Sequence, residues 1–204
     1  MAEKGQHCLY ADFLQGPLGY RRQHGAGLKQ AIAVAVGLKN RNQKLSILDV
    51  TAGLGRDAFI LATMGCHVHL IERSPVIAEL LLDGLERARK DPAVAPIIHN
   101  MKVLIMDAMT FLRNLKETEL PDIIYLDPMF PERGKSALNK IEMRIIREIV
   151  GDDLDAEALF VLALTKAKKR VVVKRPKLAP PLSNYPPNFV VKGKSNRYDV
   201  YTLH

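Results

Sequence analysis

Residues 45–57 read LSILDVTAGLGRD, and this stretch decides the fold. The apolar run from Leu45 to Val50 has the length and composition of a buried strand. Gly53 and Gly55 follow it, and a segment of helical period then runs from Arg56 to Met64. Glycines at such a turn let the main chain approach a ligand closely, above the N-terminus of a helix. The stretch therefore predicts a strand–loop–helix unit of an α/β domain with a ligand site at the loop.

The alternation of short apolar runs and helical segments continues to about residue 174. Ser74 and Pro75 supply a helix N-cap and a proline at the first helical position. Several prolines between 176 and 187 exclude a helix near the C-terminus, where two strand-like runs flank a turn at 193–196. The pattern indicates a mostly parallel sheet that ends in an antiparallel hairpin. Strands are predicted over 45–50, 68–71, 101–106, 122–126, 170–174, 189–192 and 198–203, and helices over 28–38, 56–64, 75–88, 109–115, 138–150 and 155–168.

The composition excludes several classes of protein. Of the 204 residues, 48% are hydrophobic and 25% are charged, which excludes a disordered or fibrous chain. No apolar run approaches the ~20 residues of a membrane span, and no charged-then-apolar leader opens the chain. Cys8 and Cys66 are too few and too far apart for a disulfide framework or a zinc site. We therefore expect a cytoplasmic, monomeric protein without membrane anchor or metal, with a basic loop and helix over 1–44 packed on a domain over 45–204.

The net charge of +8 is unevenly distributed along the chain. From Phe160 to His204 there are ten Lys or Arg residues against a single acid, Asp199, whereas the rest of the chain is close to neutral. A basic surface favours nucleic acid or another polyanion as a partner. The charges could equally belong to a solvated helix end and strand edge, and composition alone leaves both interpretations open.

The residues around the first loop favour one kind of cofactor. Glu72 ends the second strand, 23 residues after Asp49, where a carboxylate can accept hydrogen bonds from both hydroxyls of a ribose. The loop lacks the third glycine of a dinucleotide-binding fingerprint, and Asp57 at the helix start would repel a pyrophosphate. Asp49, in contrast, could pair with an amine. This combination favours S-adenosylmethionine over NAD, with Asp107 after the third strand near the adenine or simply capping the next helix.

The segment Asp127-Pro128-Met129-Phe130 follows the fourth strand, where ligands bind in open α/β sheets. It is close to the (Asp/Asn)-Pro-Pro-(Tyr/Phe) motif of amino-methyltransferases. An exocyclic amine on a base is a weak nucleophile because its lone pair is delocalised into the ring. Asp127 and the Pro128 carbonyl could accept its two N–H groups, and Phe130 could stack on the base. An ordinary strand-to-turn exit is the alternative interpretation.

Taken together, the motifs resemble those of the ribosomal small subunit methyltransferase J family. The resemblance runs from about Asp12 to Tyr201, and it implies a Rossmann-like, seven-stranded fold with strand order 3-2-1-4-5-7-6. It also implies methylation of a guanine N2 amine near the 3′ end of 16S ribosomal RNA. The motifs that carry it are 49–57 (DVTAGLGRD), 70–75 (LIERSP), 125–131 (YLDPMFP), 135–137 (KSA) and 171–176 (VVVKRP). By the resemblance, the cofactor site would include Arg56, Asp57, Glu72, Arg73, Asp107, Ala108 and Asp127.

Four cations near the same edge of the sheet are predicted to contact RNA, namely Lys135, Lys174, Arg175 and Lys177. The tetrapeptide at 127–130 specifies a planar amine without specifying which one, so adenine N6 or a protein glutamine are alternative targets. Two other classes remain open. A nicotinamide-dependent oxidoreductase would share the strand–helix plan and the acid for the ribose, and a non-catalytic RNA-binding assembly factor would explain the basic C-terminal part.

Overall fold

The computed structural model describes residues 9–16, 18–20, 27–129, 145, 151, 153 and 155–203. The helix predicted over 138–150 lies almost entirely outside these residues, and so do Phe130 and Lys135.

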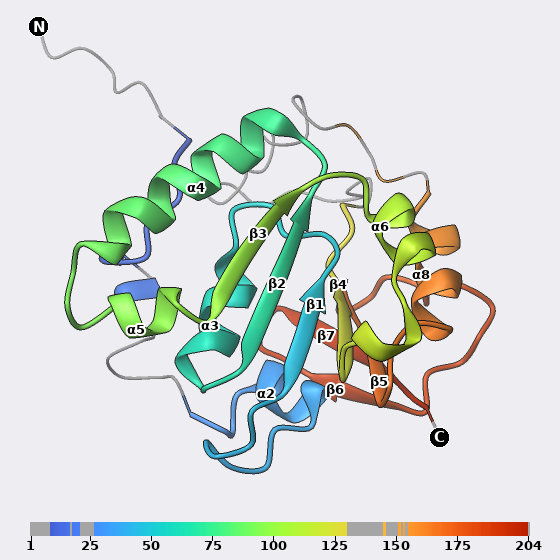
Figure 1. Ribbon diagram of the computed structural model, residues 1–204. Coiled ribbons are helices and arrows are strands. Elements are labelled where there is room, and N and C mark those ends of the chain that lie inside the picture. Colours follow the sequence, from blue (N-terminus) through green and yellow to red (C-terminus); the bar gives the residue numbers. More distant parts are fainter. Residues whose placement is uncertain are drawn as a thin grey trace, which may run out of the picture.

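The seven predicted strands form one sheet, in the order β3-β2-β1-β4-β5-β7-β6 (Figure 1). Strand β7 pairs antiparallel with both of its neighbours, and the other pairs are parallel. This confirms the expected fold class and strand order. The strands are β1 (Ser46–Asp49), β2 (His67–Glu72), β3 (Met101–Ile105), β4 (Ile123–Leu126), β5 (Arg170–Pro176), β6 (Phe189–Lys192) and β7 (Asn196–Thr202).

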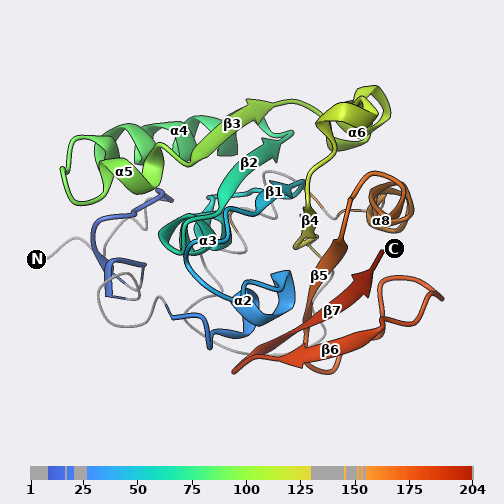
Figure 2. The same cartoon turned by 60° about the horizontal axis from the view of Figure 1, so that its bottom comes forward.

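Helices cover both faces of the sheet (Figure 2). Side chains of α2 (Ala31–Val36), α3 (Arg56–Thr63), α4 (Pro75–Arg89) and α5 (Ala95–Ile98) pack on one face. Those of α6 (Ala108–Asn114) and α8 (Ala156–Leu164) pack on the other. The short α5 and the 3-10 turn η1 (Glu117–Glu119) were not predicted, because a single turn shows no helical period.

The strands have the alternation expected of a sheet buried on both faces. In β1, Ile47 faces the core under α2–α5, and Leu48 faces the core under α6 and α8. In β4, Tyr125 and Ile124 divide in the same way. The continuous apolar run from Leu45 to Val50 reflects this double burial.

Two helix starts follow from local sequence. The Ser74 hydroxyl accepts a hydrogen bond from the Ile77 amide at 3.4 Å, with Pro75 as the first residue of α4. The Asp107 carboxylate accepts one from the Thr110 amide at 2.7 Å at the start of α6. Both caps satisfy amides that lack partners within their helix.

Several predicted boundaries differ from the structure, including the helix predicted over 28–38, which spans only Ala31–Val36, and two of the differences have a clear cause. Helix α8 ends at Leu164 and not at residue 168, because the Lys168 and Lys169 amides bond to the carbonyls of Pro121 and Asp122. Strand β5 continues to Pro176 and not to residue 174, because β7 is long enough to pair with it over its whole length. A proline is tolerated there because it is the last residue of the strand.

The hairpin turn was predicted correctly, and the Gly193 amide closes it by donating to the Asn196 carbonyl at 2.8 Å. Within the described part of the chain, none of the helices is long and apolar enough to cross a membrane.

Candidate active site

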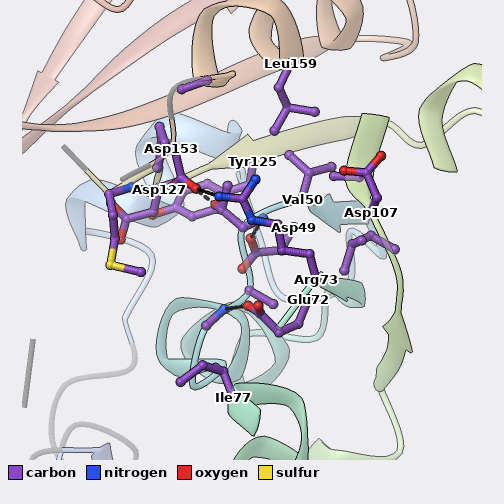
Figure 3. A pocket seen from close by; sticks show the side chains of 18 of the residues that line it. Asp49, Val50, Glu72, Arg73, Ile77, Asp107, Tyr125, Asp127, Asp153 and Leu159 are labelled. Atoms are coloured by element: carbon purple, nitrogen blue, oxygen red, sulfur yellow. Dashed lines mark hydrogen bonds and ion pairs between the residues drawn. The ribbon is translucent and has the colours of Figure 1, made fainter. Parts of the chain in front are cut away.

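A cavity of ≈ 250 Å³ lies at the carboxyl ends of β1 to β5 (Figure 3). These are the strand ends that the sequence singled out. Predicted site residues that line the cavity are Asp49, Gly53, Arg56, Asp57, Glu72, Arg73, Asp107, Ala108, Asp127, Pro128 and Lys174. Gly55, Arg175 and Lys177 do not line it.

The two glycines of the loop after β1 both have left-handed backbones, with φ of +52° at Gly53 and +70° at Gly55. A Cβ added to Gly53 would meet no protein atom within 4 Å, so this glycine leaves room above the loop. A Cβ added to Gly55 would lie 2.7 Å from Leu81 Cδ1, within the core. Gly53 therefore serves close approach to the cavity, and Gly55 serves the packing of α3 against α4.

Glu72 holds the loop in place. Its Oε2 accepts a hydrogen bond from the Gly53 amide and its Oε1 accepts one from the Ser74 amide, both at 2.8 Å. Burial raises the pKa of the Glu72 carboxyl, and these two hydrogen bonds oppose the rise. Each carboxylate oxygen has a second lone pair, so Glu72 can still accept bonds from a ligand.

Asp49 is the most deeply buried acid of the cavity, with 2% of the residue exposed. Its Oδ1 accepts a hydrogen bond from the Thr51 amide at 3.1 Å. Burial, together with repulsion by Asp57 and Asp127, raises the pKa of Asp49 to about 8. A cationic group entering the cavity would favour the ionised form of this side chain.

Lys174 connects two of the acids. Its Nζ lies 2.7 Å from Asp57 Oδ2 and 2.7 Å from Asp127 Oδ2. The buried Tyr125 hydroxyl donates to the same Asp57 oxygen at 2.6 Å. Burial alone would lower the pKa of Lys174, but the adjacent Asp127 and Asp57 raise it above its ordinary value. The lysine is therefore a fixed cation between two carboxylates.

Asp127 presents its side chain to the cavity. The side chain is 40% exposed, compared with 16% for Asp57 and 23% for Lys174. Its amide donates to Thr51 Oγ1 at 2.6 Å, which ties the end of β4 to the end of β1. A carboxylate fixed on its inner oxygen and open on its outer side can accept a hydrogen bond from a ligand.

Arg73 and Asp153 lie side by side in the lining of the cavity (Figure 3). Arg73, after β2, forms ion pairs with Asp153 at 2.5 Å and with Asp155 at 3.2 Å. Asp153 Oδ2 also accepts a hydrogen bond from the Met129 amide at 2.6 Å. The segment before α8 is thus linked to the ends of both β2 and β4.

Asp107 caps helix α6, which is one of the two roles that the sequence predicts for it. Its Oδ1 accepts bonds from the amide and the hydroxyl of Thr110, and these bonds lower the pKa of its carboxyl. Asp107 and Ala108 also line the cavity, so the cap leaves them next to any ligand there.

The charge of the cavity is opposite to that of the whole chain. Cations at three positions line it, against carboxylates at seven. The cations are Arg56, Arg73 and Lys174, and the acids are Asp49, Asp57, Glu72, Asp107, Asp127, Asp153 and Asp155. Such a lining suits a ligand with positive charge and opposes a polyphosphate.

The four residues predicted to contact RNA have different environments in the structure. Arg175 is 4% exposed, and its Nε and Nη2 donate to the Pro180 carbonyl, so it offers little surface to RNA and its predicted RNA contact stays a prediction. Lys174 points into the cavity instead of outward. Lys177 is exposed, and Lys135 lies outside the described residues. Composition does not show that Lys174 forms ion pairs in the cavity or that Arg175 is buried against a carbonyl, because such contacts depend on the folded chain.

Among the polar residues of the site that sequence reasoning missed are Thr51, Tyr125 and Asp153, together with Asp155. Thr51 and Tyr125 stand beside predicted residues, and the alternation of β4 places Tyr125 on the same face of the sheet as Ile123. Asp153 is distant in sequence, and only its acidic neighbourhood hinted at it. Among the described residues, no group of three or more His, Cys, Asp or Glu side chains could hold a metal ion.

Comparison with known proteins gives a consistent result. A family model described as a SAM-dependent methyltransferase matches residues 1–203. Two similar proteins are both named ribosomal RNA small subunit methyltransferase J. The one from Ectopseudomonas mendocina is 52% identical over 98% of this chain and 76% of its own length. The one from Nitrosococcus oceani is 50% identical over 96% of this chain and 77% of its own length.

A solved structure is similar to the whole chain. It is a SAM-dependent methyltransferase from Neisseria gonorrhoeae with 36% sequence identity and a TM-score of 0.75, and the match covers 99% of this chain and 77% of that one.

Proposed function

Because the chain belongs to the ribosomal RNA small subunit methyltransferase J family, we propose that it methylates the N2 amine of a guanine near the 3′ end of 16S ribosomal RNA. The chain is an S-adenosylmethionine-dependent methyltransferase, and the position of Asp127 carries the proposal that the methyl acceptor is a planar amine, whereas the choice of guanine N2 follows from the family. The Asp127 carboxylate is anchored by Lys174 on the inner side and open to the cavity on the outer side. A ribosomal RNA substrate would be met in the cytoplasm, and we expect the protein to act there as a monomer.

The residues of the cavity fit S-adenosylmethionine. The cofactor carries a sulfonium and an ammonium, and carboxylates at seven positions surround the space. Asp49 would face the ammonium, and Glu72 would accept bonds from the ribose while keeping its bonds to the loop. Gly53 leaves open space where a side chain would stand. Asp107 and Ala108 would lie beside the adenine.

The protein's own residues then position the amine. The Asp127 carboxylate and the Pro128 carbonyl accept its two N–H groups, which directs the nitrogen lone pair toward the cofactor. The base would leave the RNA helix to reach the site, and the sequence predicts that Phe130, which lies outside the described residues, stacks on it. The bound cofactor supplies an activated methyl group on sulfur. Catalysis by the chain therefore consists of orientation, desolvation and a fixed charge beside the amine.

A nicotinamide-dependent oxidoreductase, the main alternative from another class of protein, fits the cavity less well. A nicotinamide dinucleotide would bring a pyrophosphate into a cavity with an excess of carboxylates, including Asp57 at the N-terminus of α3. A non-catalytic RNA-binding factor would have no need of the Lys174–Asp127 pair. Adenine N6 and protein glutamine remain alternative targets, because the Asp127 geometry suits any planar amine.

The test is methyl transfer from labelled S-adenosylmethionine to 16S ribosomal RNA and to small ribosomal subunits, followed by nuclease digestion and mass spectrometry. We expect N2-methylguanosine with the wild type and a loss of at least about 100-fold with Asp127→Ala, since an orienting contact to the reacting group is removed. Binding of S-adenosylhomocysteine to Asp127→Ala, measured by calorimetry, should persist. N6-methyladenosine in the digest, or unchanged transfer by the variant, would contradict the proposal.

A further inference from the structure

The proposed function gives a role to Asp127 but none to the chain of contacts behind it. Lys174 reaches from β5 to Asp127 on the neighbouring strand end and to Asp57 at the start of α3. Both contacts are 2.7 Å, which is the length of a charge-assisted hydrogen bond. A lysine that only covered the surface would not point inward at two carboxylates.

We propose that Lys174 is a positioning residue for methyl transfer, which holds Asp127 Oδ2 so that the carboxylate is directed toward the amine and its charged form is favoured. Asp57 and Tyr125 act as its supports. The inference rests on the proposed function, and it extends that function to a residue behind the reacting groups.

Asp57 and Tyr125 restrict the conformations that the Lys174 side chain can adopt. Asp57 Oδ2 accepts from Lys174 and from the Tyr125 hydroxyl at 2.6 Å. Tyr125 is fully buried in β4, between β1 and β5, so its hydroxyl has a fixed position. The Nζ of Lys174 is therefore anchored on one side by the protein core, and its second contact fixes Asp127.

The ammonium also decides the charge of Asp127. The groups that face this carboxylate or its partners are Asp49, Asp57, Tyr125, Asp153, Lys174 and Tyr198. Burial favours the neutral acid, and the negative charges of Asp57 and Asp153 act in the same direction. Lys174 is the group that opposes them, and the pKa of Asp127 is still raised above its ordinary value, mainly by burial. A neutral Asp127 would present a hydroxyl donor to the amine, where an acceptor is needed.

This arrangement predicts opposite effects for two substitutions at neighbouring positions. Lys174→Met keeps the length of the side chain and removes the charge, so Asp127 should hold its proton to higher pH. Asp57→Asn removes a negative charge that raises the pKa of Asp127, and it also removes the carboxylate that competes with Asp127 for the Lys174 ammonium. Asp127 should therefore lose its proton at lower pH. A general loss of structure would move both variants in the same direction.

The first measurement needs no activity. The carboxyl carbon of Asp127 is followed by NMR in protein labelled with ¹³C-aspartate, with Asp127→Asn used for assignment. Relative to the wild type, we expect the midpoint of Asp127 to rise by at least one pH unit in Lys174→Met and to fall in Asp57→Asn. Lys192→Met, which changes an exposed lysine of β6, should leave the midpoint unchanged.

The second measurement is the pH profile of kcat for transfer to 16S ribosomal RNA, with folding of each variant checked by its melting curve. The acidic limb of the kcat profile should shift in the same direction as the NMR midpoint of Asp127. At pH 7, kcat should be at least 10-fold lower in Lys174→Met than in the wild type, and Lys174→Arg should restore part of it. KM for the cofactor should change less than kcat.

The experiments distinguish failure of the proposed function from failure of the positioning role of Lys174. A wild type that does not methylate the RNA overturns the proposed function, and the NMR midpoints still decide the role of Lys174. An active wild type whose Lys174→Met variant keeps both the midpoint and the acidic limb overturns the positioning role. Midpoints that move in the same direction in Lys174→Met and Asp57→Asn overturn it as well.

Discussion

At the scale of residues, the loop after β1 shows that two glycines two positions apart can serve different ends. Both have left-handed backbones, which costs an alanine about 1–2 kcal/mol. Only Gly55 has core atoms at the position of a Cβ, whereas Gly53 borders the cavity. Stability and ligand binding should therefore respond separately to substitution at these positions.

We expect Gly55→Ala to lower the free energy of unfolding by about 3 kcal/mol, since it adds a clash with Leu81 to the backbone strain. Gly53→Ala should cost about 1 kcal/mol in stability but weaken S-adenosylhomocysteine binding by at least about 10-fold, because the methyl group occupies space above the loop. Urea denaturation and calorimetry measure the two effects. Equal losses of stability in both variants would show that the clash at Gly55 is relieved.

Asp49 makes stability depend on pH. Its pKa is about 8 in the folded chain, against an ordinary value of 3.8. Between these values the folded state keeps a proton that the unfolded state has released, so the stability that this proton contributes is complete below pH ~4 and lost progressively until pH ~8. The slope is at most about 1.4 kcal/mol per pH unit.

Asp49→Asn should remove this slope, because an amide does not titrate and still accepts the Thr51 hydrogen bond. The measurement is urea denaturation of wild type and variant from pH 5 to pH 9, without cofactor. The variant should gain stability relative to the wild type as the pH rises. Parallel stability curves would mean that Asp49 is ionised in the free protein.

At the scale of elements, residues at the carboxyl ends of β2 and β3 both line the cavity and order the chain around it. Glu72 orders the loop after β1 and lines the cavity, and Asp107 caps α6 beside it. Arg73 links the end of β2 to the segment before α8 through Asp153 and Asp155. The cavity is therefore held by bonds that also start and connect the elements around it.

Two substitutions at Asp107 separate these jobs. Asp107→Ala removes the cap of α6 and should lower the free energy of unfolding by about 1 kcal/mol. Asp107→Asn keeps an acceptor for the Thr110 amide and should cost only a few tenths of a kcal/mol. If both variants bind S-adenosylhomocysteine equally weakly, the charge of Asp107 contributes to the site. If the Asn variant binds as the wild type does, the side chain serves only as a cap.

At the scale of the whole molecule, the charge is divided between an acidic cavity and a basic exterior. The chain carries +8, yet seven acids face three cations inside the cavity. The loop after β5 carries Lys177 and is held by two arginines. Arg175 bonds to the Pro180 carbonyl, and Arg197 bonds to the carbonyls of Lys177 and Ala179. Part of the basic C-terminal charge thus shapes the loop instead of meeting RNA.

Lys177→Gln and Arg175→Met are a matched pair for this distinction. Lys177→Gln should reduce the slope of log K against log salt for RNA binding by about 0.7–0.9, the effect of one phosphate contact, with stability unchanged. Arg175→Met should leave the slope unchanged and lower the free energy of unfolding by about 2 kcal/mol, because the Pro180 carbonyl loses its charged donor. A reduced slope in Arg175→Met would return that residue to the RNA-binding surface.

Sequence patterns determined the strands, the mostly parallel sheet with its antiparallel hairpin and the edge at which the cavity lies, and the strand order followed from the resemblance to the methyltransferase family. Apolar runs such as 45–50 and glycine turns such as 53–55 are local signals, and the end of each parallel strand is predictable from its own residues. Asp49, Glu72 and Asp127 could therefore be placed together before any contact was known.

Only the tertiary structure decided what the cations do. Lys174 and Arg175 are adjacent in sequence, so their side chains point to opposite faces of β5. Lys174 donates to Asp57 and Asp127, which are 117 and 47 residues away in the sequence. Arg175 donates to the Pro180 carbonyl in the loop after β5. Because an ion pair depends on distance in space and not on spacing in the chain, no pattern in the sequence distinguishes these two residues from the exposed Lys177.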